Sequence, residues 1–99
     1  MRIIAGSHRS RVIETVAGTQ TRPTSDKAKG AVFSKLGAFF DGGTMLDLFA
    51  GSGNMGLEAI SRGMEHVIFN DNSREAVSMI KKNLKTLQME QHSTVYRCV

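Results

Sequence analysis

Cysteine, proline and tryptophan are scarce in this sequence, which has one cysteine, one proline and no tryptophan in 99 residues. The single cysteine, Cys98, excludes an internal disulfide and a metal site built on several thiolates. The three histidines, His8, His66 and His92, lack ligand spacing, so we expect no metal site. No apolar run approaches the roughly 20 residues that cross a bilayer, and the N-terminus lacks the apolar core of a secretory signal. These absences predict a cytoplasmic protein.

Acidic side chains are scarce in the first third of the chain. Residues 1–30 carry six basic side chains against two acidic ones, whereas residues 31–99 carry seven of each. The formal net charge of +4 therefore lies in residues 1–30. This asymmetry favours a polyanionic partner, and we expect nucleic acid. The alternative is a basic segment that is only solvated.

The N-terminal third predicts a hairpin followed by a helix. RIIAG and RVIETV are short β-like runs on either side of GSHRS, which predicts a hairpin with a basic tip. In the loop that follows, Pro23 sets a turn, and Thr24 or Ser25 caps the next helix. FDGGT ends that helix, which we expect to be amphipathic and about four turns long. Its apolar stripe contains Ala28, Val32, Phe33, Leu36 and Phe40.

The rest of the sequence alternates between apolar strands and helices. The predicted strands are TMLDLFA (44–50), HVIFN (66–70) and STVYRCV (93–99). Between them, one helix runs from Asn54 to Arg62 and ends at Gly63, and another is capped by Ser73. The second helix has an apolar stripe and outward lysines: Ala76, Val77, Ile80, Leu84 and Leu87, with Lys81, Lys82 and Lys85.

This alternation predicts a right-handed, doubly wound α/β unit with a parallel sheet. Such sheets have helices on both faces and usually five or more strands. The three short strands predicted here make only half of such a sheet. We therefore expect the chain to be part of a longer protein.

The glycines of LDLFAGSGNMGLEA match the G-x-G-x-x-G fingerprint of a dinucleotide-binding loop. Gly51, Gly53 and Gly56 follow a predicted strand and open a helix, and Asp71 lies twenty residues after the first glycine. A carboxylate in that place accepts hydrogen bonds from ribose hydroxyls. The alternative is that the glycines serve only strand–helix packing.

Asp47 separates the ligands that this loop could hold. It lies near the end of the first strand, where its carboxylate would repel a pyrophosphate. Like charges about 4 Å apart repel by roughly 4 kcal/mol at an effective dielectric of 20. A ligand with an ammonium and a sulfonium reverses the sign of that interaction. S-adenosylmethionine (SAM) is such a ligand. The alternative role of Asp47 is to shape the turn.

At these residues the sequence resembles a known family. LDLFAGSGNMGLEAISRG looks like the first SAM-binding motif of class I methyltransferases, which have a Rossmann-like α/β fold. The series RPTSDKAKGAVFSKLG, LDLFAGSG, GLEAISRG and NDNSREAVSMIKKNL is similar to the bacterial 16S ribosomal RNA guanine-N2 methyltransferases. The resemblance covers nearly the whole chain. It implies a hairpin and helix over residues 1–41 and the first half of the SAM-binding domain over residues 42–99.

The resemblance also implies a reaction and a set of site residues. The reaction transfers a methyl group from SAM to the exocyclic N2 of a guanine in 16S rRNA of the small ribosomal subunit. The basic hairpin, Arg9 and Arg11 in particular, resembles the segment that meets RNA, and Arg22 in the following loop is a further implied RNA-binding residue. The implied cofactor-binding residues are Asp47, Phe49, Ala50, Gly51, Ser52, Gly53, Asp71, Asn72, Arg22 and Thr24. Most relatives have glutamate in place of Asp71.

No catalytic residue can be named in these 99 residues. The family's Asp/Asn-Pro-Pro-Tyr/Phe motif, which would orient the guanine amine, is absent, since Pro23 is the only proline. We therefore expect the isolated chain to be inactive. Three alternatives stay open: a methyltransferase acting on DNA or another RNA, an NAD-dependent oxidoreductase, and a basic RNA-binding module without activity.

Overall fold

The computed structural model describes residues 1–15, 26–48 and 50–98. The elements in chain order are α1 (Asp26–Leu36), β1 (Thr44–Asp47), α2 (Asn54–Ser61), β2 (His66–Asn70), α3 (Arg74–Thr86), the 3-10 helix η1 (Glu90–His92) and β3 (Ser93–Tyr96). Within these ranges, no helix is both long and apolar enough to cross a bilayer.

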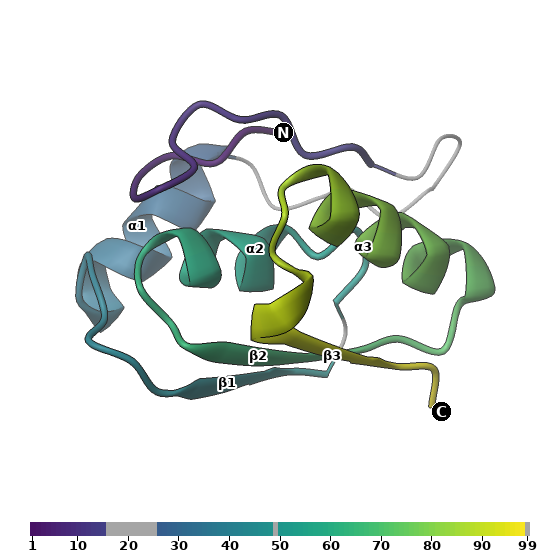
Figure 1. Ribbon diagram of the computed structural model, residues 1–99. Coiled ribbons are helices and arrows are strands. Elements are labelled where there is room, and N and C mark those ends of the chain that lie inside the picture. The colour runs from purple at the N-terminus through teal and green to yellow at the C-terminus, as the bar shows by residue number, and fades with distance from the viewer. Residues whose placement is uncertain (16–25, 49, 99) are drawn as a thin grey trace.

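The three strands form one parallel sheet in the order β1-β2-β3. Leu46 of β1 is in register with Ile68 of β2, and Phe69 of β2 with Val95 of β3. Helices α2 and α3 both lie on the same side of the sheet (Figure 1). The predicted α/β fold is therefore confirmed. Two strands are shorter than expected, because β1 ends at Asp47 and β3 at Tyr96.

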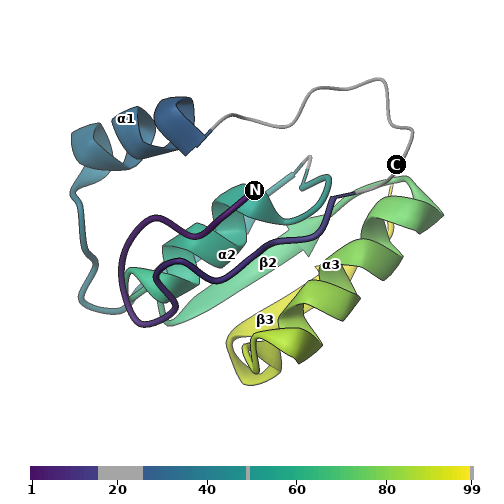
Figure 2. The ribbon, with the colours of Figure 1, turned by 90° about the horizontal axis from the view of Figure 1, so that it is seen from above.

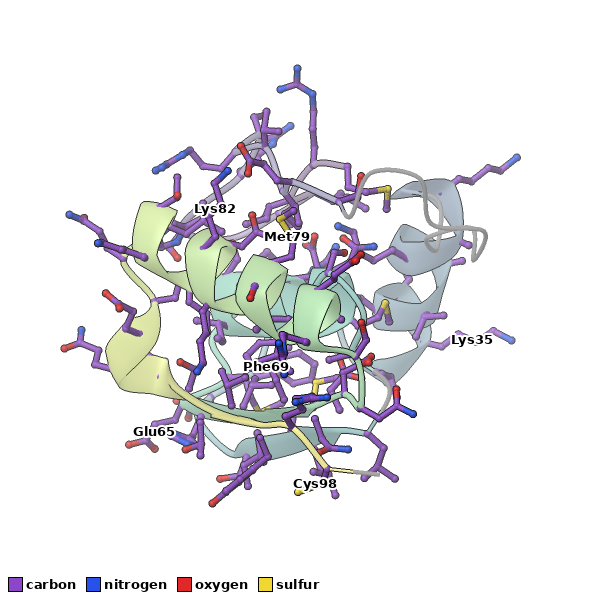
Figure 3. The ribbon with its side chains drawn as sticks, turned by 90° about the vertical axis from the view of Figure 1, so that its right-hand side faces the viewer. Lys35, Glu65, Phe69, Met79, Lys82 and Cys98 are labelled. Carbon is purple, nitrogen blue, oxygen red and sulfur yellow. The ribbon has the colours of Figure 1, made fainter. Side chains whose placement is uncertain are left out.

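Alternation along the strands separates a buried face from an exposed one. Val67 and Phe69 have no exposed surface and pack under the helices, and Figure 3 shows Phe69 in the interior while Lys82 extends outward from α3. On the other face, Leu46 and Leu48 are more than half exposed. The core of the described residues thus lies between the sheet and the two helices.

Helix α2 is covered on both sides. One side packs on the sheet, and residues 1–15 run over the other (Figure 2). The backbone amide of Ser7 donates to the carbonyl of Ser61 at 2.8 Å. A Cβ on Gly6 would lie 1.8 Å from that same oxygen, so only glycine lets the chain approach so closely.

The N-terminal hairpin is smaller than the sequence predicts. It contains a single antiparallel bridge between Arg2 and Val12 instead of two strands. Ile3 donates to the carbonyl of Arg11 at 2.9 Å, and Ile13 to that of Met1 at 2.8 Å. The pairing stops there because the backbone at Gly6 and Ser7 turns to bond the end of α2 instead.

Helix α1 corrects two predictions. It ends at Leu36, before the expected Phe40, because Gly37 follows with a left-handed φ of 108°. Of the predicted stripe, only Phe33 is buried, whereas Val32 and Leu36 are 41% and 66% exposed. The inward face instead contains Phe33 and Lys29, one turn apart. The predicted caps Thr24 and Ser25 lie outside the described residues.

Helix α3 confirms its prediction. The hydroxyl of Ser73 accepts a hydrogen bond from the amide of Ala76 at 3.2 Å, which caps the helix. The whole predicted apolar stripe of this helix is buried and its three lysines are exposed. Gly63, with a φ of 111°, follows the C-cap of α2 as predicted.

Candidate functional site

The glycine loop joins the end of β1 to the start of α2, at the carboxyl edge of the sheet. The amide of Ala50 donates to the carbonyl of Asn70 at 3.0 Å, so the loop is attached to the end of β2. The amide of Gly53 donates back to Ala50 at 2.8 Å. In open parallel α/β sheets this edge is where ligands bind.

The three glycines serve different purposes. Gly51 and Gly53 have φ angles of 57° and 87°, which residues with a Cβ adopt only with strain. A Cβ on Gly56 would lie 2.2 Å from the ring of Phe69, so this glycine lets α2 pack closely on β2. Beside Gly51 an added Cβ would meet nothing within 4 Å. The loop is therefore open to a ligand at Gly51.

Asp71 attaches the loop to the next helix. Its Oδ2 accepts a hydrogen bond from the amide of Gly51 at 2.9 Å, and its Oδ1 accepts one from the amide of Ser73 at 2.9 Å. Each oxygen keeps a second lone pair for a ligand hydroxyl. The predicted ribose-binding carboxylate thus lies directly beside the first glycine of the loop.

Asp47 lies at the end of β1, in register with Phe69 of β2. Its Oδ2 atom is buried from solvent. Asp47 and Asp71 therefore follow neighbouring parallel strands at the same edge of the sheet. The carboxylate of Asp47 disfavours a pyrophosphate and favours a cationic group, whereas Asp71 suits a ligand with hydroxyl groups. These residues fit SAM: Asp47 would hold its ammonium group and Asp71 its ribose.

Asn83 of α3 holds the glycine loop, a role that the sequence analysis missed. Its Nδ2 donates to the carbonyl of Ser52 at 3.0 Å and to that of Glu14 at 2.9 Å. Its Oδ1 accepts from the amide of Glu14 at 3.0 Å. The residue is 3% exposed. The available signal was an asparagine between Ile80 and Leu84, on the apolar side of the helix.

A buried ionic cluster supports the start of α2 and was also missed. Lys29 of α1 has no exposed surface, and its Nζ lies 3.0 Å from Oε1 of Glu58. The same Nζ donates to Oδ1 of Asn54, the first residue of α2, at 2.7 Å. The Nε of Arg62 donates to Oε2 of Glu58 at 2.7 Å.

Residues 1–15 bind the same carboxylate. The amides of Ile4 and Ala5 donate to the two oxygens of Glu58 at 2.8 and 3.1 Å. Burial alone would raise the pKa of Glu58, but the hydrogen bonds from Ile4, Arg62 and Lys29 outweigh it, so the pKa lies below its ordinary value of 4.5. Glu58 is therefore a buried carboxylate that joins the N-terminal segment, α1 and α2.

Two of the three predicted RNA-binding arginines, Arg9 and Arg11, lie away from the glycine loop, and Arg22 lies outside the described residues. Arg9 is exposed at the hairpin tip, by the amino ends of the strands. Arg11 is exposed too, and its Nη2 donates to the carbonyl of Thr86, at the end of α3, at 3.2 Å. A helix C-terminus leaves such carbonyls without intrahelical partners, so Arg11 also caps α3.

The structure thus brings one group of predicted cofactor residues together. Ala50, Gly51, Ser52 and Gly53 form the loop, Asp47 and Asp71 flank it, and Asn72 is exposed after Asp71. Phe49, Arg22 and Thr24 lie outside the described residues.

Comparison with known proteins then decides the family. The model of the family described as Conserved hypothetical protein 95 matches residues 1–98. The chain belongs to this family. Its curated relatives include proteins named rRNA methyltransferases, and the resemblance inferred from the motifs is confirmed.

Two curated relatives show the breadth of the family. The chain is 55% identical over 97 residues to "Putative rRNA methyltransferase YlbH" of Bacillus subtilis (strain 168), covering 98% of this chain and 53% of the relative. It is 39% identical over 88 residues to ribosomal RNA small subunit methyltransferase D of Haemophilus influenzae, covering 89% and 46%. The chain therefore spans about half the length of the curated relatives it matches.

Solved structures agree with the fold. "Putative methyltransferase yhhF" from Escherichia coli superposes with a TM-score of 0.83 at 29% identity, covering 99% of this chain and 52% of that one. A methylase structure from Haemophilus influenzae gives 0.75 at 33% identity, covering 98% and 51%. Both similarities place the chain in the Rossmann-like methyltransferase fold.

Proposed function

We propose that this chain is the cofactor-binding half of a SAM-dependent methyltransferase that modifies the exocyclic N2 of a guanine in 16S rRNA. The observation that carries the proposal is the pair of carboxylates, Asp47 and Asp71, around the open glycine at the carboxyl edge of the sheet. The relative from Haemophilus influenzae, named a small-subunit rRNA methyltransferase, supports the choice of substrate.

The chain's residues have distinct roles in this proposal. Asp47 binds the ammonium group of the methionine part, Asp71 accepts hydrogen bonds from the ribose, and the turn at Gly51–Gly53 admits the ligand to the backbone. Asn83 and Glu58 act indirectly: Asn83 holds the glycine loop in place, and Glu58 supports helix α2. When bound, SAM supplies a methyl group on a positively charged sulfur.

The guanine amine needs a group that orients it toward that methyl group. The 99 residues contain no Asp/Asn-Pro-Pro-Tyr/Phe motif, so we assign no catalytic residue to them.

Calorimetry distinguishes the cofactor classes. The full-length protein should bind SAM and S-adenosylhomocysteine, and it should not bind NAD, because Asp47 repels a pyrophosphate. Micromolar binding of NAD without a SAM signal would refute the proposal and favour the oxidoreductase. Methyl transfer to 16S rRNA, compared with duplex DNA and 23S rRNA, then separates the three possible substrates.

Asp71→Ala tests the site itself. We expect SAM binding to weaken by about 1–3 kcal/mol, since charge-assisted hydrogen bonds are removed and Gly51 loses its acceptor. The matched control is Glu75→Ala, which removes an exposed carboxylate from the first turn of α3. Equal affinity in the two variants would mean that Asp71 only shapes the loop.

A further inference from the structure

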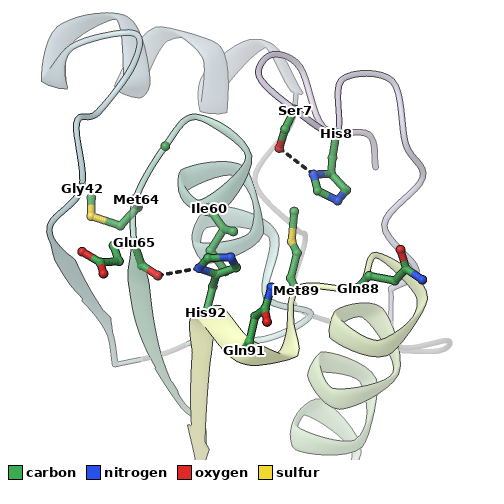
Figure 4. Close-up of a pocket in the computed structure, with 11 residues that line it drawn as sticks. Ser7, His8, Gly42, Ile60, Met64, Glu65, Gln88, Met89, Gln91 and His92 are labelled. Atoms are coloured by element: carbon green, nitrogen blue, oxygen red, sulfur yellow. Dashed lines mark hydrogen bonds between the residues drawn. The ribbon is translucent and has the colours of Figure 1, made fainter.

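A cavity lies at the opposite end of the sheet from the glycine loop. Its volume is about 550 Å³, within the range of roughly 300–1,000 Å³ that small-molecule sites have. The hairpin tip, the connection from α2 to β2, and the segment from α3 to η1 surround it (Figure 4). No residue assigned to the cofactor lines it.

The cavity is apolar inside and polar at its rim. Ile60 and Met89 line it and are 7% and 1% exposed. Around the opening, Figure 4 shows His8 and Gln88 on one side and Glu65 on the other. An apolar interior with a few polar groups suits a flat, partly polar ligand such as a nucleobase.

The hydrogen bonds of the two histidines determine which of their ring nitrogens can still bond a ligand. Nδ1 of His92 lies 2.9 Å from the backbone carbonyl of Glu65 and must donate to it, because a carbonyl only accepts. The neutral ring then presents Nε2 as an acceptor. His8 is occupied at both nitrogens, by the hydroxyl of Ser7 at 2.7 Å and the carbonyl of Leu87 at 2.8 Å.

The Glu65 carboxylate is exposed and, like Nε2 of His92, is an acceptor. Glu65 and His92 both line the cavity, so its lining includes two acceptors that favour a ligand edge that donates hydrogen bonds. Adenine, cytosine and guanine carry such an edge in their exocyclic amines. Uracil instead places two carbonyl oxygens on either side of its ring N–H, where they would face these acceptors.

Gln88 occupies a position that glycine would normally take. It follows the C-cap of α3 with a φ of 57°, in the left-handed region. The backbone there would be relaxed by glycine, yet a long amide side chain lines the cavity. Such a residue at the rim is consistent with a binding role.

Positive charge surrounds the opening on the hairpin side. Arg9 is exposed and follows His8 in the chain. Arg11 bonds the carbonyl of Thr86, at the end of α3, and the exposed Lys85 is three residues before Gln88 in the chain. Glu90, in η1, is the opposing exposed acid next to this segment.

We propose that this cavity binds an unpaired, amine-bearing nucleobase of the RNA substrate, while Arg9, Arg11 and Lys85 contact the phosphates on either side. Single-stranded RNA is recognised in this way, with bases turned out of the strand and read on their edges. The inference rests on the proposed function for its choice of RNA. It adds a non-catalytic base-binding site at the end of the molecule away from the cofactor loop.

The test is fluorescence anisotropy of the full-length protein with short, labelled oligo(A), oligo(C) and oligo(U) at low salt. We expect oligo(A) and oligo(C) to bind about five-fold more tightly than oligo(U), the discrimination that one net hydrogen bond provides. Glu65→Ala should abolish this ratio. Glu90→Ala removes the same charge outside the cavity and should leave the ratio unchanged.

Gln88→Gly is a second variant that does not endanger the fold, because glycine suits the left-handed backbone. It should weaken binding of oligo(A) and oligo(C). Absence of RNA binding, absence of a base preference, or a preference that Glu65→Ala leaves intact would each overturn the proposal. SAM binding, measured on the same proteins, tests the proposed function separately: a base preference without SAM binding would refute the methyltransferase and keep the cavity.

Discussion

Glu58 receives hydrogen bonds from three separate parts of the chain although it has no exposed surface. The amides of Ile4 and Ala5, the ammonium of Lys29 and the guanidinium of Arg62 all contact its carboxylate. Removing one member of a buried ion pair leaves the other charges without compensation. This single side chain therefore joins the N-terminal segment and α1 to α2.

We expect Glu58→Gln to lower the free energy of unfolding by about 3–5 kcal/mol, because two buried cations lose their counter-ion. Urea denaturation at neutral pH measures the change. The control is Glu90→Gln. The Glu90 side chain is exposed, so this substitution should change the free energy of unfolding by less than about 0.5 kcal/mol. Similar values for both variants would show that the cluster contributes no more than a surface acid.

The lowered pKa of Glu58 also predicts a pH dependence. Since the folded-state pKa lies below the ordinary value of 4.5, this contribution to stability is complete above about pH 4.5. It disappears as the pH falls through the folded-state pKa. Unfolding midpoints taken from about pH 6 to about pH 3 should therefore drop less steeply in Glu58→Gln than in the unsubstituted protein.

At the scale of elements, two glycines in helices have opposite surroundings. A Cβ on Gly56 of α2 would lie 2.2 Å from the ring of Phe69. A Cβ on Gly30 of α1 would meet only the end of Ile4, at an ordinary 3.5 Å. Neither residue has a positive φ. The same substitution therefore tests packing at one position and helix propensity at the other.

We expect Gly56→Ala to destabilise the protein by about 1–3 kcal/mol, because the methyl group pushes α2 away from β2. Gly30→Ala should stabilise it by about 0.5–1 kcal/mol, since alanine loses less backbone entropy in a helix. Thermal or urea unfolding of both variants provides the measurement. A neutral Gly56→Ala would mean that this glycine serves the ligand and not the packing.

The hairpin gives a second element-scale prediction. Arg9→Ala together with Arg11→Ala should weaken RNA binding and reduce the slope of its salt dependence by up to about one unit for each phosphate that is no longer neutralised. SAM affinity should stay the same. Because Arg11 also caps α3, Arg9→Ala alone is the cleaner variant, and Lys35→Ala, on α1, is its control. An unchanged salt slope would place the RNA site elsewhere.

The sequence predicted those elements whose patterns are local. The 3.6-residue stripe and the serine cap identified α3, and apolar runs between glycines identified the strands. Helix α1 was predicted too long because Gly37 lies inside a run that otherwise continues to Phe40. The prediction of its inward face was wrong because Lys29 carries a charge, and its burial is favourable only with partners that are distant in sequence, Glu58 and Asn54 among them.

The candidate site was predicted to a similar extent. Motif spacing placed the glycines and both aspartates at one edge of the sheet, since the carboxyl ends of parallel strands meet there. Asn83 was missed because its partners, Ser52 and Glu14, are distant in sequence. The cavity at the other end was missed for the same reason: its lining comes from the hairpin, the α2–β2 connection and η1.

At the scale of the whole molecule, one face of the described sheet is not covered by a helix, and β1 is an edge strand. In the described residues β1 pairs only with β2, and Leu46 and Leu48 are 57% and 53% exposed beside it. Unpaired strand edges next to apolar side chains promote pairing with other chains. We therefore expect the isolated 99-residue chain to self-associate or to be marginally stable.

A methyl-transfer assay tests most directly the proposal that this chain is only the cofactor-binding half of the enzyme. The isolated chain should transfer no label from SAM to unmethylated small subunits, because in our proposal it contributes only the cofactor-binding residues and no group that orients the guanine amine. A chimera that joins this chain to the unmatched half of the Bacillus subtilis relative, to which this chain is 55% identical over 97 residues, should restore transfer. Asp71→Ala in the chimera is the control and should reduce it. Turnover by the 99 residues alone, at a rate near that of the chimera, would show that the amine-orienting group lies within them.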